Sequence, residues 1–205
     1  RGGSSMITPG LAKIEGFVKI HDPKTGEVFV DKKNAINYEN ISIAMAQTLS
    51  DRNLGYIYQM AFGNGGSSVD PTGVITYLPP NTTGQNATLY NETYAKVVDD
   101  NSAADTDPQA NKMTVLHTSG TVYTDILVTC LLDYGEPPEQ QAFDNSLDMN
   151  GNFVFDELGL RSYNPLGTGL LLTHVIFHPV QKSLNRLIQI DYTVRIQSLT
   201  NLVTI

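Results

Sequence analysis

The clearest hydrophobic pattern in the chain is a two-residue alternation near its C-terminus. In the stretch SLNRLIQIDYTVRIQSL, apolar side chains recur at every second position and polar side chains stand between them. Successive side chains of a β-strand point to opposite faces, so this alternation predicts a strand with one buried face. The positions predicted to be buried are Ile188, Ile190, Tyr192, Val194 and Ile196.

Other segments also read as strands. Near the N-terminus, two short apolar runs flank the segment 22–26, whose proline and glycine predict a hairpin turn. The runs KMTVLHT, YTDILVTCLLDY and LLLTHVIFHPV predict further strands. The last two are apolar enough that we expect them to be buried on both faces.

One segment, NISIAMAQTLSD, has helical spacing. Ile41, Ala44, Met45 and Leu49 recur on one side of the predicted helix, and Asn40 is the expected N-cap. Together these elements predict a mainly β protein, an antiparallel β-sandwich with one early α-helix and long polar loops.

The length of 205 residues fits one domain. Residues 1–10 are expected to be disordered, with 1–5 read as an addition before a natural start at Met6. Residues 11–205 are expected to form a single β-sandwich-like domain. Between about 63 and 111 the chain is dense in Gly, Pro, Asn, Ser and Thr. This composition predicts a loop-rich insert, which a compact domain rarely keeps unless the loops make contacts.

Charge, hydropathy and cysteine content argue against several classes of partner and of covalent structure. The net charge is -8 and no basic run is present, which argues against binding nucleic acid. No apolar run approaches the length needed to span a bilayer, and the first residues lack the apolar stretch of a signal peptide, so no membrane partner is expected. Cys130 is the only cysteine, which excludes an internal disulfide, and its apolar setting predicts a buried structural thiol.

The stretch SLDMNGNFVFDE, residues 146–157, is similar to an EF-hand calcium loop. Asp148, Asn150 and Glu157 occupy the third, fifth and twelfth positions, where oxygen ligands belong. However, Ser146 stands where the first acidic ligand is expected.

The flanks of this loop also disagree with an EF-hand, because prolines and glycines replace the two helices. The run 153–155 favours a strand, followed by a bend at Leu158-Gly159. We therefore interpret the motif as the entry of a loop into a strand, with Asp148, Asn150 and Glu157 left as a weak calcium candidate. No bound metal is predicted.

No constellation in the sequence supports catalysis. His174 and His178 are four residues apart, and on a strand this spacing separates them by roughly 13 Å, too far to share one ion. The stretch GNGGS lacks the Lys-Ser/Thr ending of a phosphate-binding loop and reads as a flexible turn. Neither a nucleophile elbow nor a persuasive carboxylate pair is present. We therefore predict no catalytic residue, no cofactor and no enzymatic activity.

Two stretches, TGEVFVDKKNAINYENIS near the start and FDELGL with LLTHVIFHPVQKSLNRLIQIDYTVRI at the end, resemble virion structural proteins of tailed bacteriophages, of the tail, neck, baseplate or capsid-associated kind. The resemblance carries no active-site residue. It implies a non-enzymatic subunit located in the virion, with itself as a homo-oligomer and other virion proteins as partners.

The polar insert fits such a role, because loops on a β scaffold can hold neighbouring subunits in register. We expect Tyr77, Leu78 and Tyr90 to be its apolar interface anchors. The main alternative is a binding module, either a host-receptor or carbohydrate-binding β module of a phage tail or a calcium-dependent adhesive domain. The aromatic composition does not decide whether the protein binds carbohydrate. Trp, the residue most used to stack on sugars, is absent, but ten Tyr are present.

Overall fold

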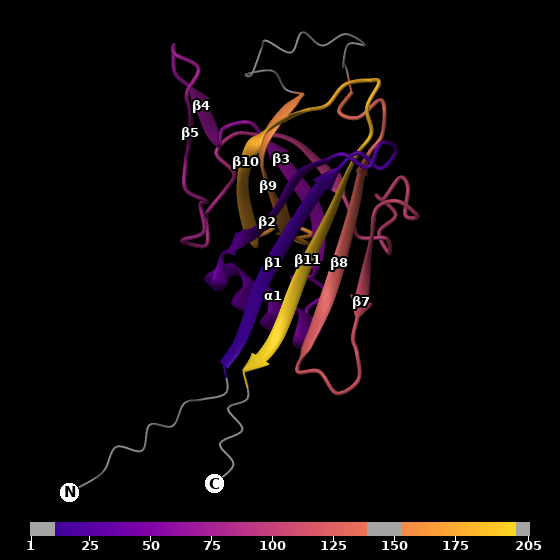
Figure 1. Ribbon diagram of the computed structural model, residues 1–205. Coiled ribbons are helices and arrows are strands. Elements are labelled where there is room, and N and C mark those ends of the chain that lie inside the picture. The colour runs from indigo at the N-terminus through magenta and orange to yellow at the C-terminus, as the bar shows by residue number, and fades with distance from the viewer. Residues whose placement is uncertain (1–10, 139–152, 200–205) are drawn as a thin grey trace, which may run out of the picture.

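The computed structural model describes residues 11–138 and 153–199, and it confirms the mainly β architecture (Figure 1). The expected disorder of residues 1–10 concerns a segment outside the described residues. In chain order the elements are β1 (Leu11–His21), β2 (Val28–Ile36), α1 (Tyr38–Leu49), β3 (Ile57–Gly63), β4 (Ser67–Val69), β5 (Ile75–Tyr77), β6 (Glu92–Val97), β7 (Lys112–Leu116), β8 (Tyr123–Leu132), β9 (Val154–Ser162), β10 (Thr173–Gln181) and β11 (Ile188–Leu199).

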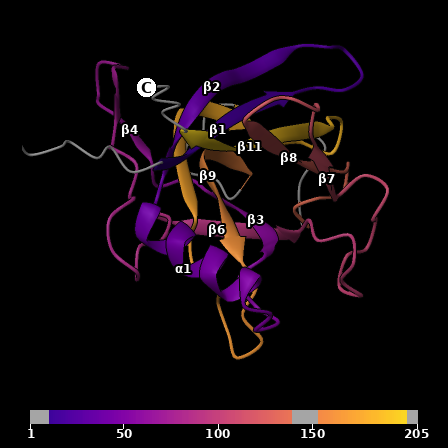
Figure 2. The ribbon, with the colours of Figure 1, turned by 90° about the horizontal axis from the view of Figure 1, so that it is seen from below.

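Nine strands form one antiparallel sheet, in the order β6-β3-β9-β10-β2-β1-β11-β8-β7, and β4 and β5 form a separate pair. The sheet curls at the junction of β2 and β10, where only two residue pairs join the strands. The five strands from β2 to β7 therefore face the four strands from β10 to β6 (Figure 2). Side chains from both halves pack into one hydrophobic cluster, so the predicted sandwich is a single curled sheet closed over its own core.

The C-terminal strand occupies the centre of the first half. β11 pairs with β1 on one side and with β8 on the other. Ile190 and Tyr192 are fully buried, and Ile196 is partly buried against the core. The alternation in the sequence predicted both this strand and its buried face, and the structure confirms them.

The predicted hairpin at the N-terminus is also confirmed. The Asp22 carboxylate accepts hydrogen bonds from the backbone N–H groups of Lys24 at 2.8 Å and Thr25 at 3.2 Å. Gly26 has a φ of 78°, a left-handed conformation that glycine adopts without strain.

The helix α1 lies across the lower end of the curled sheet (Figures 1 and 2). Its N-cap is Asn37, whose side chain accepts the backbone N–H of Asn40 at 3.1 Å, so the prediction of Asn40 as the cap is wrong. Asn40 instead sits in the first turn, fully buried, and donates to Leu171 O at 2.9 Å. Asn37 and Asn40 are both asparagines close to the start of the helix, so residue type alone does not identify which of them is the cap. No helix among the described residues is long and apolar enough to cross a membrane.

β8 and β10 differ in how fully they are buried. β10 is buried on both faces over its first five residues, as expected. In β8 only Val128, Cys130 and Leu132 are buried and the alternate residues are partly exposed, so the prediction of burial on both faces is wrong for this strand. The predicted burial of the Cys130 thiol is confirmed.

β9 runs without interruption through Leu158 and Gly159, so the predicted bend at this point is wrong. All nine residues of the strand are buried. A Cβ at Gly159 would lie 2.2 Å from Thr173 O on the neighbouring β10. The glycine therefore permits close approach of two backbones inside the sheet and does not mark a turn.

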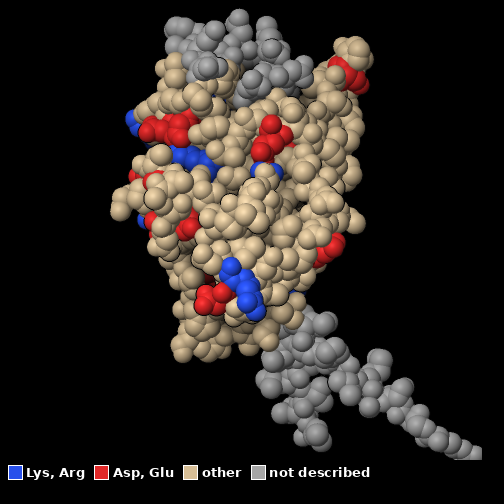
Figure 3. Space-filling model, turned by 180° about the vertical axis from the view of Figure 1, so that it is seen from behind, with Lys and Arg blue, Asp and Glu red and all other residues tan. Residues whose placement is uncertain are grey.

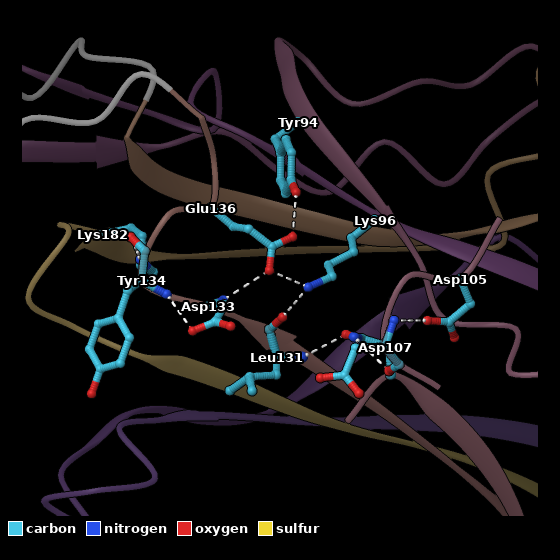
Figure 4. Close-up of polar contacts among 10 residues, drawn as sticks. Tyr94, Lys96, Asp105, Asp107, Leu131, Asp133, Tyr134, Glu136 and Lys182 are labelled. Atoms are coloured by element: carbon cyan, nitrogen blue, oxygen red, sulfur yellow. Dashed lines mark hydrogen bonds and ion pairs between the residues drawn. The ribbon is translucent and has the colours of Figure 1, made fainter. Parts of the chain in front are cut away.

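Side chains join β6, at one end of the curled sheet, to β8, which is next to the other end (Figure 4). Among the described residues, no backbone ladder links these two strands. Lys96 on β6 donates to Leu131 O on β8 at 2.6 Å and forms an ion pair with Glu136. Tyr94 donates to the same Glu136 carboxylate at 2.9 Å. The Asn111 side chain accepts Leu131 N at 2.9 Å. These contacts fix the second half of the sheet against the first.

Candidate interaction site

The hairpin of β4 and β5 stands out to one side of the main sheet (Figure 1). We call residues 64–78 the arm and residues 79–91, which lead back to β6, the return loop. Asp70 is the only charged residue in both segments. It lies in the hairpin turn and accepts N–H groups of Thr72 at 2.8 Å and Val74 at 2.9 Å. These bonds, with that of the Thr72 hydroxyl foremost, hold the pKa of Asp70 below its usual value.

Large apolar side chains are exposed on these two segments, whose only charge is that of Asp70. Those exposed by 40% or more are Val69, Val74, Tyr77, Leu78 and Tyr90. Seen from behind, the surface of the arm is largely uncharged, with acidic atoms gathered near its tip (Figure 3). Depletion of charge together with exposed aromatic and aliphatic groups is typical of the core of a protein interface. The arm therefore has the composition of a contact surface.

The structure places the three predicted interface anchors along one side of β10. The Tyr77 hydroxyl lies 3.1 Å from Nδ1 of His178. The Tyr90 hydroxyl donates to the backbone oxygen of Pro79, and its ring centroid lies 5.5 Å from that of His174. Leu78 follows Tyr77 directly and is 45% exposed. The role of these residues as interface anchors stays a prediction.

The base of the arm is held by a buried carboxylate. Asp156 on β9 accepts the N–H groups of Gly66 and Ser67, each at 2.9 Å, and the Ser67 hydroxyl at 2.6 Å. A Cβ at Gly63 would lie 2.3 Å from Asn91 O, and one at Gly66 would lie 2.8 Å from a side-chain carbon of Ile176. The glycine-rich stretch is thus tightly packed against its surroundings, and the prediction of a merely flexible turn is wrong.

A second anchor, formed by Glu157 on β9 and His174 on β10, fixes both ends of the return loop. The backbone N–H of Asn91 donates to Glu157 Oε1 at 3.4 Å, and that of Asn81 donates to His174 Nδ1 at 2.8 Å. Since Nδ1 accepts, the proton of the neutral imidazole is on Nε2, which lies 3.8 Å from Glu157 Oε1.

Both members of this pair are fully buried, and burial sets their protonation. Loss of hydration raises the pKa of Glu157 to about 7 and lowers the pKa of His174 to about 4. Glu157 Oε2 and His174 Nε2 have no hydrogen-bond partner among the described residues. Near neutral pH the pair therefore holds at most one charge, on Glu157.

The weak calcium candidate is only partly tested. Asp148 and Asn150 lie outside the described residues. Glu157 is enclosed beneath the return loop, so its carboxylate is engaged by backbone groups of the protein. The described residues contain no group of three or more His, Cys, Asp or Glu that could hold a metal ion. His174 and His178 both lie on β10, as predicted, the first buried and the second exposed.

The return loop belongs to the packed body of the protein. Leu89 is 4% exposed and packs with Ala61 and Leu171. Asn37 donates its side-chain N–H to Gly84 O at 3.0 Å. β6, which also lies within the predicted insert, is a strand of the main sheet. These contacts were not predictable from the sequence, because Leu89 lies in a mostly polar stretch without strand or helix periodicity.

No protein-family model, curated protein sequence or solved structure matches the chain. The geometry described above shows what this site can do. The arm carries one charged residue and is held at its base by Asp156, its return loop is held by Glu157 and His174, and both segments present apolar side chains outward.

Proposed function

We propose that the protein is a non-enzymatic structural subunit of a tailed-phage virion, which assembles symmetrically with itself and with other tail, neck or capsid proteins. The assembly role is supported chiefly by one observation: the arm, which has a single charged residue and exposed apolar side chains, stands out from the sheet on a buried anchor. The phage assignment is supported by the resemblance of the two end segments to virion proteins.

The anchor favours a structural role for the arm. An isolated two-stranded hairpin is marginally stable in water. Here the hairpin is tied to β9 by three hydrogen bonds that its residues donate to the Asp156 carboxylate, and the return loop is tied to β9 and β10. A surface that is ordered before contact loses less conformational entropy on binding, which suits a subunit that must join neighbours in one orientation.

The charge of the chain favours assembly on a template. At -8 per chain, copies in dilute buffer repel one another, and an uncharged arm adds no attraction at long range. The isolated subunit therefore stays monomeric until salt or a partner surface offsets the repulsion. For this reason the function is best tested within particles.

The test compares two sets of exposed apolar residues. Val74→Ser with Leu78→Ser removes two exposed apolar groups of the arm and leaves the Tyr77–His178 contact in place. Leu166→Ser is the control, because Leu166 is 95% exposed on a different loop. Each variant is supplied during phage growth, and its amount in purified particles is measured by quantitative mass spectrometry, with thermal melts of the free proteins as the check on folding.

The arm variant is expected to melt like the parent protein and to enter particles at least about tenfold less efficiently, while the control enters normally. Parental incorporation of the arm variant would refute the role of the arm. Absence of the parent protein from purified particles would refute the virion assignment, and binding of the isolated protein on a glycan array would favour a carbohydrate-binding module in its place.

A further inference from the structure

The two ends of the return loop are held by buried acceptors of different chemistry. At its start, the backbone N–H of Asn81 donates to Nδ1 of His174 at 2.8 Å. At its end, the backbone N–H of Asn91 donates to Glu157 Oε1 at 3.4 Å. His174 and Glu157 are both fully buried. Uptake of a proton by these two acceptors therefore affects the two ends of the loop differently.

Protonation removes the acceptor at the start of the loop only. A protonated carboxyl group keeps an oxygen that accepts a hydrogen bond, so Glu157 can still hold Asn91 in acid. An imidazolium ring carries a proton on both nitrogens and accepts at neither. Protonation of His174 would thus place its Nδ1–H against the N–H of Asn81, two donors at 2.8 Å. The hydrogen bond at the start of the loop is incompatible with a charged His174.

This hydrogen bond is the main attachment of the first part of the return loop, residues 79–83. None of residues 79–83 is buried. Among the described residues, no other hydrogen bond joins this segment to the main sheet. The bonds from the Asn81 side chain to Thr88 O and from the Tyr90 hydroxyl to Pro79 O both stay within the return loop. The start of the loop can therefore detach without disturbing the sheet.

The rest of the return loop is attached by groups that do not titrate. The Asn37 side chain donates to Gly84 O at 3.0 Å, and Leu89 is buried against Ala61 and Leu171. These attachments lie after residue 83, so they confine a detachment of the loop to its first residues.

The groups that surround His174 offer no compensation for a positive charge. Glu157 on β9 is the nearest carboxyl, with its Oε1 3.8 Å from Nε2 of His174, and burial raises its pKa to about 7, so in acid it is neutral. The return loop contributes the ring of Tyr90, and β2 contributes the Lys32 ammonium, which is bonded to Ile176 O on β10. Burial in this setting lowers the pKa of His174 to about 4.

Two more ionisable groups lie nearby on the same strands, and neither holds the start of the loop. Asp156 on β9 binds the base of the arm. His178 on β10 is exposed and lies 3.1 Å from the Tyr77 hydroxyl. A hydroxyl group both donates and accepts, so the contact between Tyr77 and His178 tolerates protonation of this second histidine.

We propose that His174 is an acid-operated latch: its neutral ring holds the start of the return loop on β10, and protonation of the ring releases residues 79–83 while the sheet stays folded. The released segment directly follows Tyr77 and Leu78, so acid loosens the arm on the side of these exposed apolar residues. A histidine that must lose a hydrogen bond in order to gain a proton is a common basis of such switches. The latch does not depend on the proposed function, since it concerns only what holds the loop.

The experiment follows hydrogen exchange of the full chain by NMR between about pH 7 and about pH 3.5, on either side of the lowered pKa of His174. The reporter is the Asn81 amide, and its protection is expressed relative to an unstructured chain, which removes the intrinsic effect of pH. The Leu78 amide is the internal control, because it donates to Gly66 O at 2.8 Å and a bond between two backbone groups does not titrate. The same samples give the titration midpoint of each histidine ring.

Two variants separate His174 from other groups that titrate in acid. In His174→Asn, the amide oxygen can accept the N–H of Asn81 and does not take up a proton. His178→Gln is the matched control, because His178 lies on the same strand and is exposed. Thermal melts at neutral pH check that both variants are folded.

In the parent protein, the protection of Asn81 should fall at least about tenfold on acidification, at the pH where His174 takes up its proton, while Leu78 stays protected. His178→Gln should behave like the parent. His174→Asn should keep Asn81 protected over the whole range.

Protection of Asn81 that persists after His174 has titrated would overturn the proposal. Loss of protection at Asn81 and Leu78 together would also overturn it, because the arm or the whole protein would then be unfolding. An acid response of His174→Asn equal to that of the parent would assign the effect to another group. If His174→Asn does not fold, the parent alone decides: coincident midpoints for Asn81 and His174 support the latch, and midpoints more than about one pH unit apart contradict it.

Discussion

The buried pair of Glu157 and His174 predicts an unusual dependence of stability on pH. In the folded protein the pKa of Glu157 is raised from the ordinary value of 4.5 to about 7, and that of His174 is lowered from 6.5 to about 4, both because burial disfavours charge. Between pH 4.5 and 6.5 the unfolded chain therefore has an ionised Glu157 and a protonated His174. The folded protein has both groups neutral, so folding moves a proton from one to the other without net uptake.

Glu157 and His174 change the stability of the folded protein in opposite directions as pH rises. For Glu157 the folded state holds a proton that the unfolded chain has released, so its contribution to stability falls as pH rises from 4.5 through about 7. For His174 the unfolded chain holds a proton that the folded state lacks, so its contribution rises between about pH 4 and 6.5. Each slope is about 1.4 kcal/mol per pH unit, and each integrates to roughly 3 kcal/mol over its range.

The two contributions can be separated by replacing Glu157 and His174 one at a time. The unfolding free energy of Glu157→Gln minus that of the parent should rise by roughly 3 kcal/mol between pH 4.5 and 7, because the variant lacks the Glu157 contribution that falls over this range. His174→Gln should lose a similar amount between pH 4 and 6.5. Glu27→Gln, on the exposed turn between β1 and β2, is the control and should follow the parent.

The assay is urea unfolding at half-unit pH intervals, with each variant compared with the parent at the same pH, which removes the contributions of other ionisable groups. The reasoning would be refuted if both variants kept the pH profile of the parent, or if the two difference profiles had the same sign.

Three other predictions concern the core, the arm and the metal. Ile190→Ala should lower the unfolding free energy by about 2–5 kcal/mol and the Tm by several degrees, because Ile190 is fully buried, whereas Gln189→Ala should change little; equal effects would mean that the register of β11 is wrong. Asp156→Ala should speed hydrogen exchange at Gly66 and Ser67 about tenfold or more, since a bond to a charged acceptor contributes about 1.5–3 kcal/mol, and unchanged exchange there would remove Asp156 as the anchor. Calorimetric titration with calcium should show no site tighter than about millimolar, the weak end of calcium modules, and micromolar binding lost in Glu157→Gln would restore the calcium interpretation.

Strands whose pattern is local were predictable from the sequence. β11 has strict alternation, and the β1–β2 hairpin has proline and glycine at turn positions, so both could be placed with the correct faces. Errors arose where a residue type serves two purposes. The sequence predicts a turn at Gly159, whereas this glycine allows the close approach of β10, and it predicts Asn40 as the cap, whereas Asn40 donates to the carbonyl oxygen of Leu171.

The exposed residues of the candidate site were predictable from the sequence, but the buried residues that hold them were not. Tyr77, Leu78 and Tyr90 stand out as apolar residues in a polar stretch, and the structure leaves them exposed on the arm and its return loop. Their anchor could not be predicted, because Asp156, Glu157 and His174 lie 90, 66 and 93 residues from the backbone groups that they hold. Contacts over such separations depend on strand register, which composition does not determine.

The most direct test of the account asks what the arm touches in an assembled particle. A photo-crosslinking amino acid is placed at Leu78 or, as the control, at the exposed Leu166, and intact purified particles are irradiated and analysed by mass spectrometry. If the arm is an assembly contact, position 78 crosslinks to a neighbouring subunit, of this protein or of another virion protein, and position 166 does not. Crosslinks from position 166 alone, or none from position 78 in particles that contain the protein, would contradict it.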